Sequence, residues 1–389
     1  MLTLPVYLDN SATTPVDPRV LEAMLPYFTK YFGNAASRTH VYGWQAEEAV
    51  EIAREQVAAL IGAEPKEIVF TSGATESDNL ALKGVFEAYS SKGNHIITVA
   101  TEHKAVLDTC RHIEKMGGEV TYLPVQKNGL IDLQELEAAI KPSTILIAVM
   151  YANNEIGVIQ PIQQISAIAK KHGILFFSDA AQAVGKIPVN VIDNGIDILA
   201  LSGHKIFGPK GVGALYVRRK NPRVKLAAQM DGGGHEKGMR SGTLNVPAIV
   251  GLGKACELCS QEMTNDIARI KLLRDKLENA LLNIGATHLN GHKNQRLPNA
   301  SNISFKNAEA EGLMISLNKN IAVSSGSACT SASIEPSYVL KAIGLSDELA
   351  YSSIRFGLGR FTTEEEIDYT IAQVTMAVQK MREASRAAI

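Results

Sequence analysis

Short apolar runs alternate with helical patterns through the first two thirds of the chain. The runs are rich in branched and aromatic residues, as expected for buried strands. They cover residues 68–70, 96–99, 120–123, 145–150, 175–177, 198–201 and 214–217. Helical patterns lie between most of them, as at 77–89, 104–116 and 162–172. This alternation predicts an α/β fold with a mainly parallel seven-stranded sheet and helices on both faces.

The pattern changes near residue 256, where long charged helices and a few short strands take over. A long charged helix is predicted at 262–284, with strands at 302–305 and 353–356. The last helix carries one apolar stripe at helical spacing, made by Ile367, Ile371, Val374, Val378 and Met381. We therefore expect a large domain at 15–255 and a smaller α+β domain formed by 1–14 with 256–389.

Composition narrows the class of partner. The chain has 389 residues, of which 20% are charged, and a net charge of -1. Such a balance gives no global attraction for nucleic acid or a membrane surface, which favours small molecules and proteins as partners. The longest apolar run, 145–150, is too short to span a bilayer, and the N-terminus does not resemble a secretion signal. We expect a cytoplasmic protein.

The four cysteines are too few for a disulfide framework in a chain of this length, so a special cysteine among them is expected to be reactive. The spacing of Cys256 and Cys259 fits half a zinc site or a redox pair. No second pair completes a metal site, and both thiols share a helix face with Leu252. We interpret this pair as core and predict no firm metal site.

Polar residues that follow the apolar runs are the candidates for chemistry, because open α/β sheets bind ligands at the carboxyl ends of their strands. A turn of small residues from Thr71 to Ser77 follows the first run, and free backbone N–H groups at the helix start would favour a phosphate. Gly73, Ala74 and Thr75 lie in this turn. A plain N-cap that binds nothing is the alternative interpretation.

Two further strand ends carry ionisable groups. Asp179 follows a very apolar run, with Gln182 three residues later, and a buried carboxylate needs a partner such as a protonated pyridine nitrogen. Helix capping by Asp179 is the alternative. Lys205 lies between a buried strand and a glycine-rich turn, where apolar surroundings lower an amine pKa. A lone lysine is otherwise usually solvated surface.

One cofactor, pyridoxal 5'-phosphate, needs a phosphate site, an acidic partner for its ring nitrogen and a lysine for its aldehyde. The turn, the aspartate and the lysine together match these three requirements. The chain then resembles the NifS/IscS cysteine desulfurases, of the IscS type with the longer catalytic loop. The resemblance runs from about residue 6 to the final helix. It rests on segments 7–15, 71–79, 101–104, 153–157, 202–205 and 240–243. It implies the aspartate aminotransferase-like fold, that of the fold type I pyridoxal-phosphate-dependent transferases.

The resemblance implies a role for each matching residue. Lys205 would bind the cofactor covalently and move the Cα proton, while His103 would stack on the ring and act as acid and base. Asp179 would pair with the pyridine nitrogen and Gln182 with the phenolic oxygen. The phosphate and substrate contacts would come from a larger set. It comprises Gly73, Ala74, Thr75, Ser202, His204 and a partner subunit's Thr243 for the phosphate, and Arg355 with Asn154 for the substrate carboxylate. Asn154 would also contact the cofactor.

Cys329 lies in a run of small residues, 324–333, that cannot pack a core and predicts an exposed loop. The segment is similar to the nucleophile loop of the family, and a tight structural turn with an incidental thiol is the alternative. We expect Cys329 to take the sulfur of L-cysteine as a persulfide and to release L-alanine. The resemblance also allows Cys329 to ligate an iron–sulfur cluster transiently during transfer.

The expected partners are a second copy of the chain in a homodimer, an iron–sulfur scaffold protein and other sulfur acceptors, including those of tRNA thiolation. Alternatives are a selenocysteine lyase or another pyridoxal-phosphate enzyme of this fold, and a sulfur-relay scaffold whose main role is protein docking. A basic cluster could attract acidic partner proteins, although a solvated surface is its alternative interpretation. It consists of Arg218, Arg219, Lys220, Arg223 and Lys225.

Overall fold

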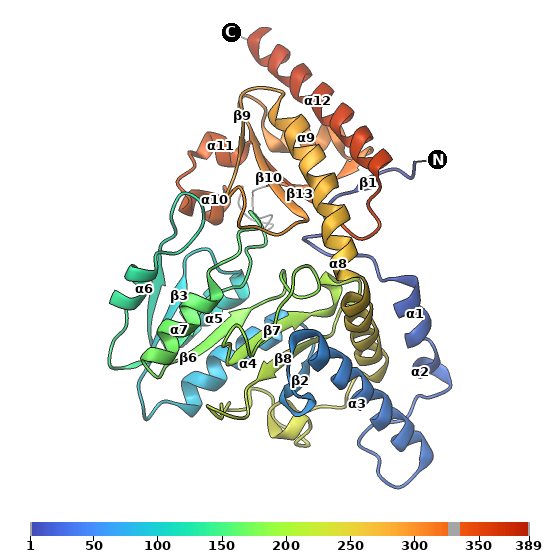
Figure 1. The fold of residues 1–389 in the computed structure, drawn as a ribbon, viewed down its shortest axis with the longest axis vertical. Helices are drawn as coiled ribbons and strands as arrows, with labels where there is room; N and C mark the ends of the chain where they lie inside the picture. The colour runs from blue at the N-terminus through green and yellow to red at the C-terminus, as the bar shows by residue number, and fades with distance from the viewer. Residues whose placement is uncertain (1, 326–334, 388–389) are drawn as a thin grey trace.

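A seven-stranded sheet forms the centre of the larger part of the molecule (Figure 1). The computed structural model describes residues 2–325 and 335–387. The strand order is β2-β8-β7-β6-β5-β3-β4; β8 runs antiparallel to β2 and β7, and the other adjacent strands are parallel. The strands are β2 (Ile68–Thr71), β3 (His95–Val99), β4 (Glu119–Leu123), β5 (Thr144–Ala148), β6 (Leu175–Asp179), β7 (Ile198–Ser202) and β8 (Gly213–Val217). The seven predicted apolar runs and the mainly parallel sheet are confirmed.

Helices cover both faces of this sheet. On one face, Leu80 of α4 (Ala74–Ala88) and Val106 of α5 (Lys104–Lys115) share a core with the sheet. On the other face, α3 (Val41–Ile61), α7 (Ile162–Lys171) and the start of α8 (Val246–Leu282) build the largest core. The remaining helices of this part are α1 (Pro18–Met24), α2 (Pro26–Thr29) and α6 (Leu133–Ala138).

A smaller antiparallel sheet, β12-β13-β10-β9, lies above the large one in Figure 1 and has its own core with α9 and α12. The first strand of the chain, β1, pairs with β11 beside this sheet. The elements are β1 (Val6–Tyr7), β9 (Thr287–Leu289), β10 (Ala300–Phe305), α9 (Ala310–Leu317), β11 (Ile321–Ala322), β12 (Ser324–Ser325), α10 (Tyr338–Ala342), α11 (Asp347–Tyr351), β13 (Ser353–Gly357) and α12 (Glu364–Ala387).

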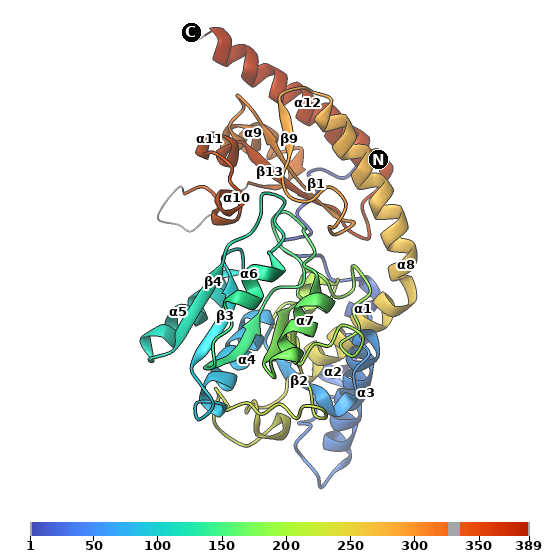
Figure 2. The ribbon, with the colours of Figure 1, turned by 60° about the vertical axis from the view of Figure 1, so that its left-hand side comes forward.

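Helix α8 connects the two parts, and Figure 2 shows it running along one side from the large sheet to the small one. It begins at Val246, not near residue 262 as the charge pattern predicted. The apolar first half, with Pro247 in its first turn and Asn245 capping the Ala248 N–H, packs against the large core, while the second half packs against the small one. The helix passes residue 256 without a break, so the domain boundary stays a prediction.

The fold bears on the cysteine pair near residue 256 and on whether any helix could span a membrane. Cys256 and Cys259 are free thiols buried in the large core, which confirms their interpretation as core residues. In the described part of the chain, no helix is both long and apolar enough to cross a membrane.

Candidate active site

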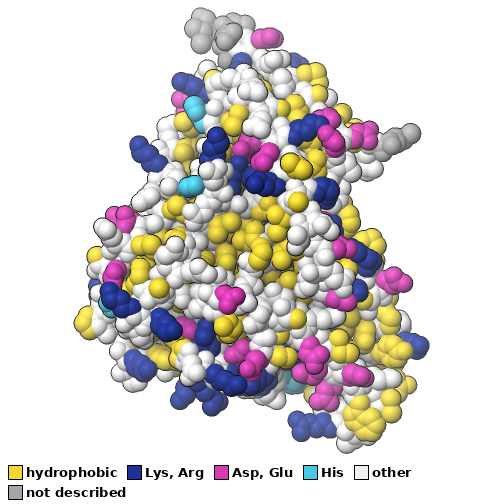
Figure 3. All heavy atoms as spheres, viewed as in Figure 1, with side chains coloured by type: hydrophobic (Ala, Val, Ile, Leu, Met, Phe, Trp, Pro, Cys, Tyr) yellow, Lys and Arg dark blue, Asp and Glu magenta, His cyan; other side chains and the backbone are white. Residues whose placement is uncertain are grey.

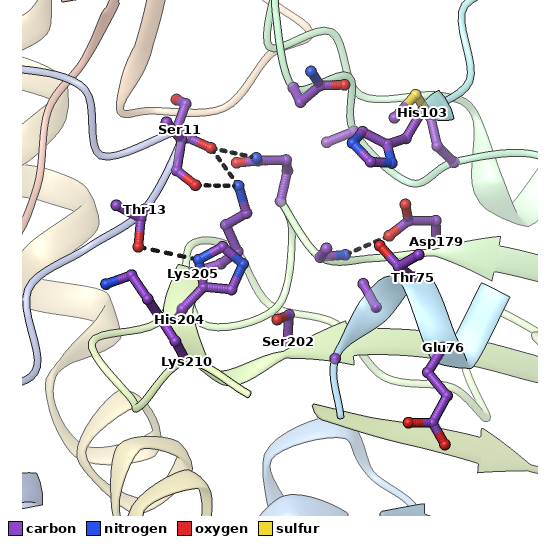
Figure 4. Close-up of a pocket in the computed structure, with 18 of the residues that line it drawn as sticks. Ser11, Thr13, Thr75, Glu76, His103, Asp179, Ser202, His204, Lys205 and Lys210 are labelled. Atoms are coloured by element: carbon purple, nitrogen blue, oxygen red, sulfur yellow. Dashed lines mark hydrogen bonds between the residues drawn. The ribbon is translucent and has the colours of Figure 1, made fainter. Parts of the chain in front are cut away.

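A cavity of about 660 Å³ lies at the carboxyl ends of the parallel strands, where segments from the two parts of the molecule meet (Figure 4). Most of the predicted site residues line it: Gly73, Ala74, Thr75, His103, Asn154, Asp179, Gln182, Ser202, His204, Lys205 and Arg355. Thr243 is exposed and is not among the lining residues. Cys329 and most of the predicted loop lie outside the described residues.

Lys205 ends a short 3₁₀ turn (Gly203–Lys205) that follows β7. Its Nζ donates to the carbonyl oxygens of Ser11 and Ala12, both at 2.7 Å. Burial lowers the pKa of this amine to about 8, and the positive charge of Arg355 acts in the same direction. A substantial fraction of Lys205 is therefore a neutral, nucleophilic amine near neutral to mildly alkaline pH.

Asp179 is the last residue of β6, and the surrounding apolar sheet buries it. Its Oδ1 accepts the Ala181 N–H at 2.9 Å, so part of the predicted capping alternative is present, although a turn rather than a helix follows. Burial raises the carboxyl pKa, while this N–H, His103 and Lys205 oppose the rise. A cationic ligand group placed here would favour the ionised carboxylate.

The N-terminus of α4 faces the cavity without a side-chain cap. Gly73 holds a φ of 149°, which an L side chain rarely adopts. The backbone of β8 also approaches closely, since a Cβ at Gly213 would lie 2.7 Å from the Cα of Gly73. The turn therefore presents backbone N–H groups and the positive end of the helix dipole to the cavity, as an anion site requires.

Ser202 lies beside this helix start, and His204 lies farther along the same cavity (Figure 4). The Nδ1 of His204 is 3.1 Å from the Thr13 hydroxyl. Burial, followed by the charge of Lys205, lowers the pKa of His204 to about 4. The imidazole is therefore neutral at physiological pH and offers an anion a hydrogen bond rather than a charge.

Arg355 extends from β13 of the smaller sheet into the cavity. Its guanidinium donates to the Asn154 carbonyl oxygen at 3.0 Å, the Asp9 carboxylate at 2.9 Å and the Ser324 hydroxyl at 3.1 Å. Among the described residues, its Nε and the side-chain oxygen of Asn154 are buried without a hydrogen-bond partner. These two atoms retain unused hydrogen-bonding capacity beside the fixed guanidinium.

His103 caps α5, where its Nδ1 accepts the Ala105 N–H at 3.2 Å. This bond requires an unprotonated Nδ1, so the other ring nitrogen carries the proton when the imidazole is neutral. The ring is exposed at the cavity wall in this single chain. It can therefore exchange a proton with a ligand in the cavity.

Several cavity residues were not assigned by sequence reasoning. Ser11 and Thr13 hold Lys205 and His204, and Lys210 reaches the same wall. Asp9 and Ser11 belong to a segment that carried the family resemblance, but their partners lie 346 and 194 positions away along the chain. The charge of Asp9 was the only local signal in this segment, and a charge alone does not identify the residue that it contacts.

The segment that carries Thr243 is anchored beside α4. Arg240 pairs with Glu76 of that helix at 2.7 Å, and the Gly242 N–H donates to the ring of His235 at 3.2 Å. His235 therefore shapes this loop. Thr243 is exposed on the surface in this loop, which is anchored to α4, the helix whose N-terminus faces the cavity.

Comparison with known proteins identifies the family. The aminotransferase class-V family model matches residues 6–370. "Cysteine desulfurase IscS" of Pectobacterium carotovorum is 60% identical over 386 residues, covering 99% of this chain and 95% of the relative. The corresponding protein of Klebsiella pneumoniae is 59% identical with the same coverage.

Solved structures agree with these relatives. A "NIFS-LIKE PROTEIN" superposes with a TM-score of 0.90 and 39% identity, covering 97% of this chain and all of that one. A structure described as "SspA in complex with cysteine" has a TM-score of 0.81 and 39% identity, covering 92% and 100%. The predicted aminotransferase-like α/β fold is confirmed. The chain belongs to the aminotransferase class-V family and, within it, to the cysteine desulfurases.

Proposed function

We propose that this cysteine desulfurase uses pyridoxal 5'-phosphate bound in the 660 Å³ cavity to convert L-cysteine to L-alanine. The sulfur would pass to Cys329 as a persulfide. The observation that carries the proposal is the meeting of Lys205, Asp179 and the uncapped start of α4 in one cavity. These three features are what this cofactor needs for its aldehyde, its ring nitrogen and its phosphate.

The residues present fit the cofactor in charge and hydrogen bonding. The backbone turn at Gly73 presents the α4 N–H groups to the cavity, where a phosphate would lie with Thr75, Ser202 and neutral His204 around it. Asp179 would pair with the ring nitrogen and Gln182 with the phenolic oxygen. When bound, the cofactor supplies an electron sink for the carbanion that forms at Cα.

Residues of this chain would position the substrate and transfer its protons. Arg355 would hold the substrate carboxylate bidentately with the Asn154 amide beside it, because a planar guanidinium matches a carboxylate in geometry. Lys205, with its pKa near 8, can remove a proton from Cα and return one. His103 would move the proton of the substrate thiol through the ring nitrogen that α5 leaves free.

The sulfur step needs no oxidant. The thiolate of Cys329 attacks the substrate sulfur, an S–S bond forms, and the Cβ–S bond breaks. The bonding electron pair passes to the three-carbon fragment, which gains protons and leaves as L-alanine. An ordinary cysteine is only a few per cent thiolate at neutral pH, so a nearby base or cation must assist Cys329.

A homodimer is proposed as the working form. Large hydrophobic side chains are exposed on α1, α2 and the start of α3, and Figure 3 shows hydrophobic surface over this region at the lower right. The exposed residues are Leu21, Leu25, Phe28, Phe32, Val41, Tyr42 and Trp44. Such a patch favours association. Thr243, held at the surface beside α4, would complete the partner's phosphate site.

We also propose that the persulfide is delivered to an iron–sulfur scaffold protein and to other acceptors, including those of tRNA thiolation. This rests on the IscS name of the relatives. A cytoplasmic location is proposed with it, supported by the free thiols of Cys110, Cys256 and Cys259. A preference for selenocysteine is the competing function, and parallel assays with both amino acids distinguish them.

Cys329→Ser tests the proposal. The variant should keep the yellow colour of bound cofactor and the spectral response to L-cysteine, because only the nucleophile is removed. Alanine and sulfide formation should fall by about three orders of magnitude or more. Cys110→Ala, at a buried position outside the cavity, is the control and should retain turnover. Normal turnover by Cys329→Ser would overturn the role of Cys329, and a colourless wild type that gains no activity from added cofactor would overturn the cofactor.

A further inference from the structure

Lys186 is a partly buried lysine behind the cavity that the proposed chemistry does not use. Its Nζ donates to the Oε1 of Gln182 at 2.7 Å. Burial lowers its pKa to about 7, and the positive charges of Lys205 and Arg355 add to the effect. Among the described residues no carboxylate forms an ion pair with it. Asp266 lines a small cavity with Lys186 but is taken by Arg360 at 2.9 Å.

The bonds of the Gln182 amide have only one possible direction. Because its pKa is about 7, Lys186 is partly neutral near pH 7, but the amine keeps N–H donors in both forms and can donate to the amide oxygen in each. On the other side, the Nε2 of Gln182 lies 2.8 Å from the carbonyl oxygen of Ser11, which can only accept. The two neighbours therefore specify the same orientation of the amide.

This orientation decides what Gln182 presents to the cavity. The amide nitrogen has two hydrogens, of which Ser11 takes one, so the second remains for an oxygen in the cavity that Gln182 lines. The same Ser11 carbonyl oxygen also accepts from Lys205 at 2.7 Å. Lys186, Gln182, Ser11 and Lys205 thus form one continuous chain of hydrogen bonds, and Figure 4 shows its Ser11–Lys205 bond.

We propose that Lys186 is a positioning residue, which fixes the Gln182 amide with its nitrogen toward Ser11 and the cavity. The inference rests on the proposed function, since Gln182 is the residue expected to bind the phenolic oxygen of the cofactor. Without Lys186, only the Ser11 carbonyl oxygen holds the amide in this orientation, so the amide turns its oxygen toward the cavity more often. It would then repel a phenolic oxygen instead of donating to it.

Lys186→Met tests this, because it removes the donor and keeps an unbranched apolar side chain of similar length. We expect the apoprotein to bind pyridoxal phosphate about 3- to 10-fold more weakly, as the loss of one hydrogen bond predicts. The pH midpoint of the absorbance change of the bound cofactor should shift in the same direction as in Gln182→Ala. Lys171→Met, at an exposed lysine of α7, should change neither quantity.

A double variant separates positioning from an independent effect of charge. If Lys186 acts through Gln182, Lys186→Met should add nothing to affinity or to the absorbance midpoint in a Gln182→Ala background. Lys186→Arg retains a donor and should stay near the wild type in both quantities. Thermal unfolding shows whether Lys186→Met folds as an apoprotein. If it does not, Lys186→Arg and Lys186→Gln, which both keep a donor, are compared with the wild type instead.

The outcomes distinguish this inference from the proposed function. Additive effects of Lys186→Met and Gln182→Ala, or a Lys186→Met protein that matches the wild type while Gln182→Ala does not, would overturn the positioning role alone. Failure of the wild-type apoprotein to bind pyridoxal phosphate would overturn the proposed function instead.

Discussion

Arg355 shows how a single side chain can be prepared before its ligand arrives. Backbone and side-chain oxygens from Asn154, Asp9 and Ser324 hold its guanidinium, and these residues come from three distant segments. The side-chain entropy of a long arginine is therefore already lost in the free protein. A substrate carboxylate would meet a guanidinium whose position is already fixed.

Arg355→Lys should raise the KM for L-cysteine by about 10- to 100-fold, because an ammonium cannot replace the bidentate contact of a guanidinium. The kcat should change much less, since the chemistry occurs at Cα and sulfur. Steady-state alanine formation over a range of cysteine concentrations measures both constants. Arg269→Lys, at an arginine that donates to the Thr362 carbonyl oxygen outside the cavity, is the control. A fall in kcat with an unchanged KM would contradict the assignment.

Between elements, α4 and the sheet enclose carboxyl oxygens that lack hydrogen-bond partners in the described part of the chain. Both oxygens of Asp78 on α4 and one oxygen of Glu102, which follows β3, are buried without hydrogen bonds in the described part of the chain. Burial raises the pKa of both groups well above the usual values, and Asp179 adds to the rise. These two carboxyls should therefore stay protonated in the folded protein at pH values where they ionise in the unfolded chain.

The pH dependence of stability follows from this shift. Where the folded chain keeps a proton that the unfolded chain has lost, the free energy of unfolding falls by about 1.4 kcal/mol per pH unit for each group. The loss begins above the ordinary carboxyl pKa, near 4, and continues up to the folded pKa. Below that range both states hold the proton and no penalty exists.

Asp78→Asn should remove the share of this penalty that belongs to Asp78. The thermal unfolding midpoint of the apoprotein should rise relative to the wild type at pH 8, and the gain should disappear as the pH approaches 4. Asp108→Asn on the exposed face of α5 should show no such trend. A loss of stability at pH 8 that equals the loss at pH 4 would instead mean that the Asp78 side chain has partners of its own.

On the surface of the folded chain, two of the five residues of the predicted basic cluster are already in ion pairs. Arg218 is engaged with Asp197 at 3.0 Å, and Lys220 lies 3.3 Å from Glu64. Arg219, Arg223 and Lys225 form no side-chain ion pair with any described residue, and the last two are exposed. These three charges are the ones able to attract an acidic partner.

Reversal of Arg219, Arg223 and Lys225 to glutamate should weaken binding of an acidic sulfur acceptor or regulator, and added salt should weaken the wild-type complex in the same way. Alanine formation from free cysteine with a small-molecule reductant should stay nearly unchanged. Reversal of Lys115, Lys271 and Lys319 gives the same net charge elsewhere and is the control. Binding that ignores both salt and the first reversal would place docking on another surface.

The elements and several residues that line the cavity were predictable because their signals are local. Apolar periodicity located the seven strands of the large sheet, and ionisable residues following two apolar runs pointed to Asp179, at the end of β6, and Lys205, in the turn after β7. The start of α8 was misplaced, because its first half is apolar on several faces and lacks the charged pattern that marked the rest. Tertiary packing on the large core, not local amphipathicity, stabilises that half.

The hydrogen-bond partners inside the cavity were decided only when the chain folded. Ser11 meets Lys205 from 194 positions away, and Asp9 meets Arg355 from 346, so no window of sequence contains both members of either pair. The depressed pKa of Lys205 and the orientation of Gln182 by Lys186 depend on burial and on distances between segments, which are properties of the packed structure. The sequence alone therefore identified the elements and the reactive residue types, because periodicity and residue chemistry are local. The folded structure alone set their protonation and orientation, because these follow from contacts that only folding creates.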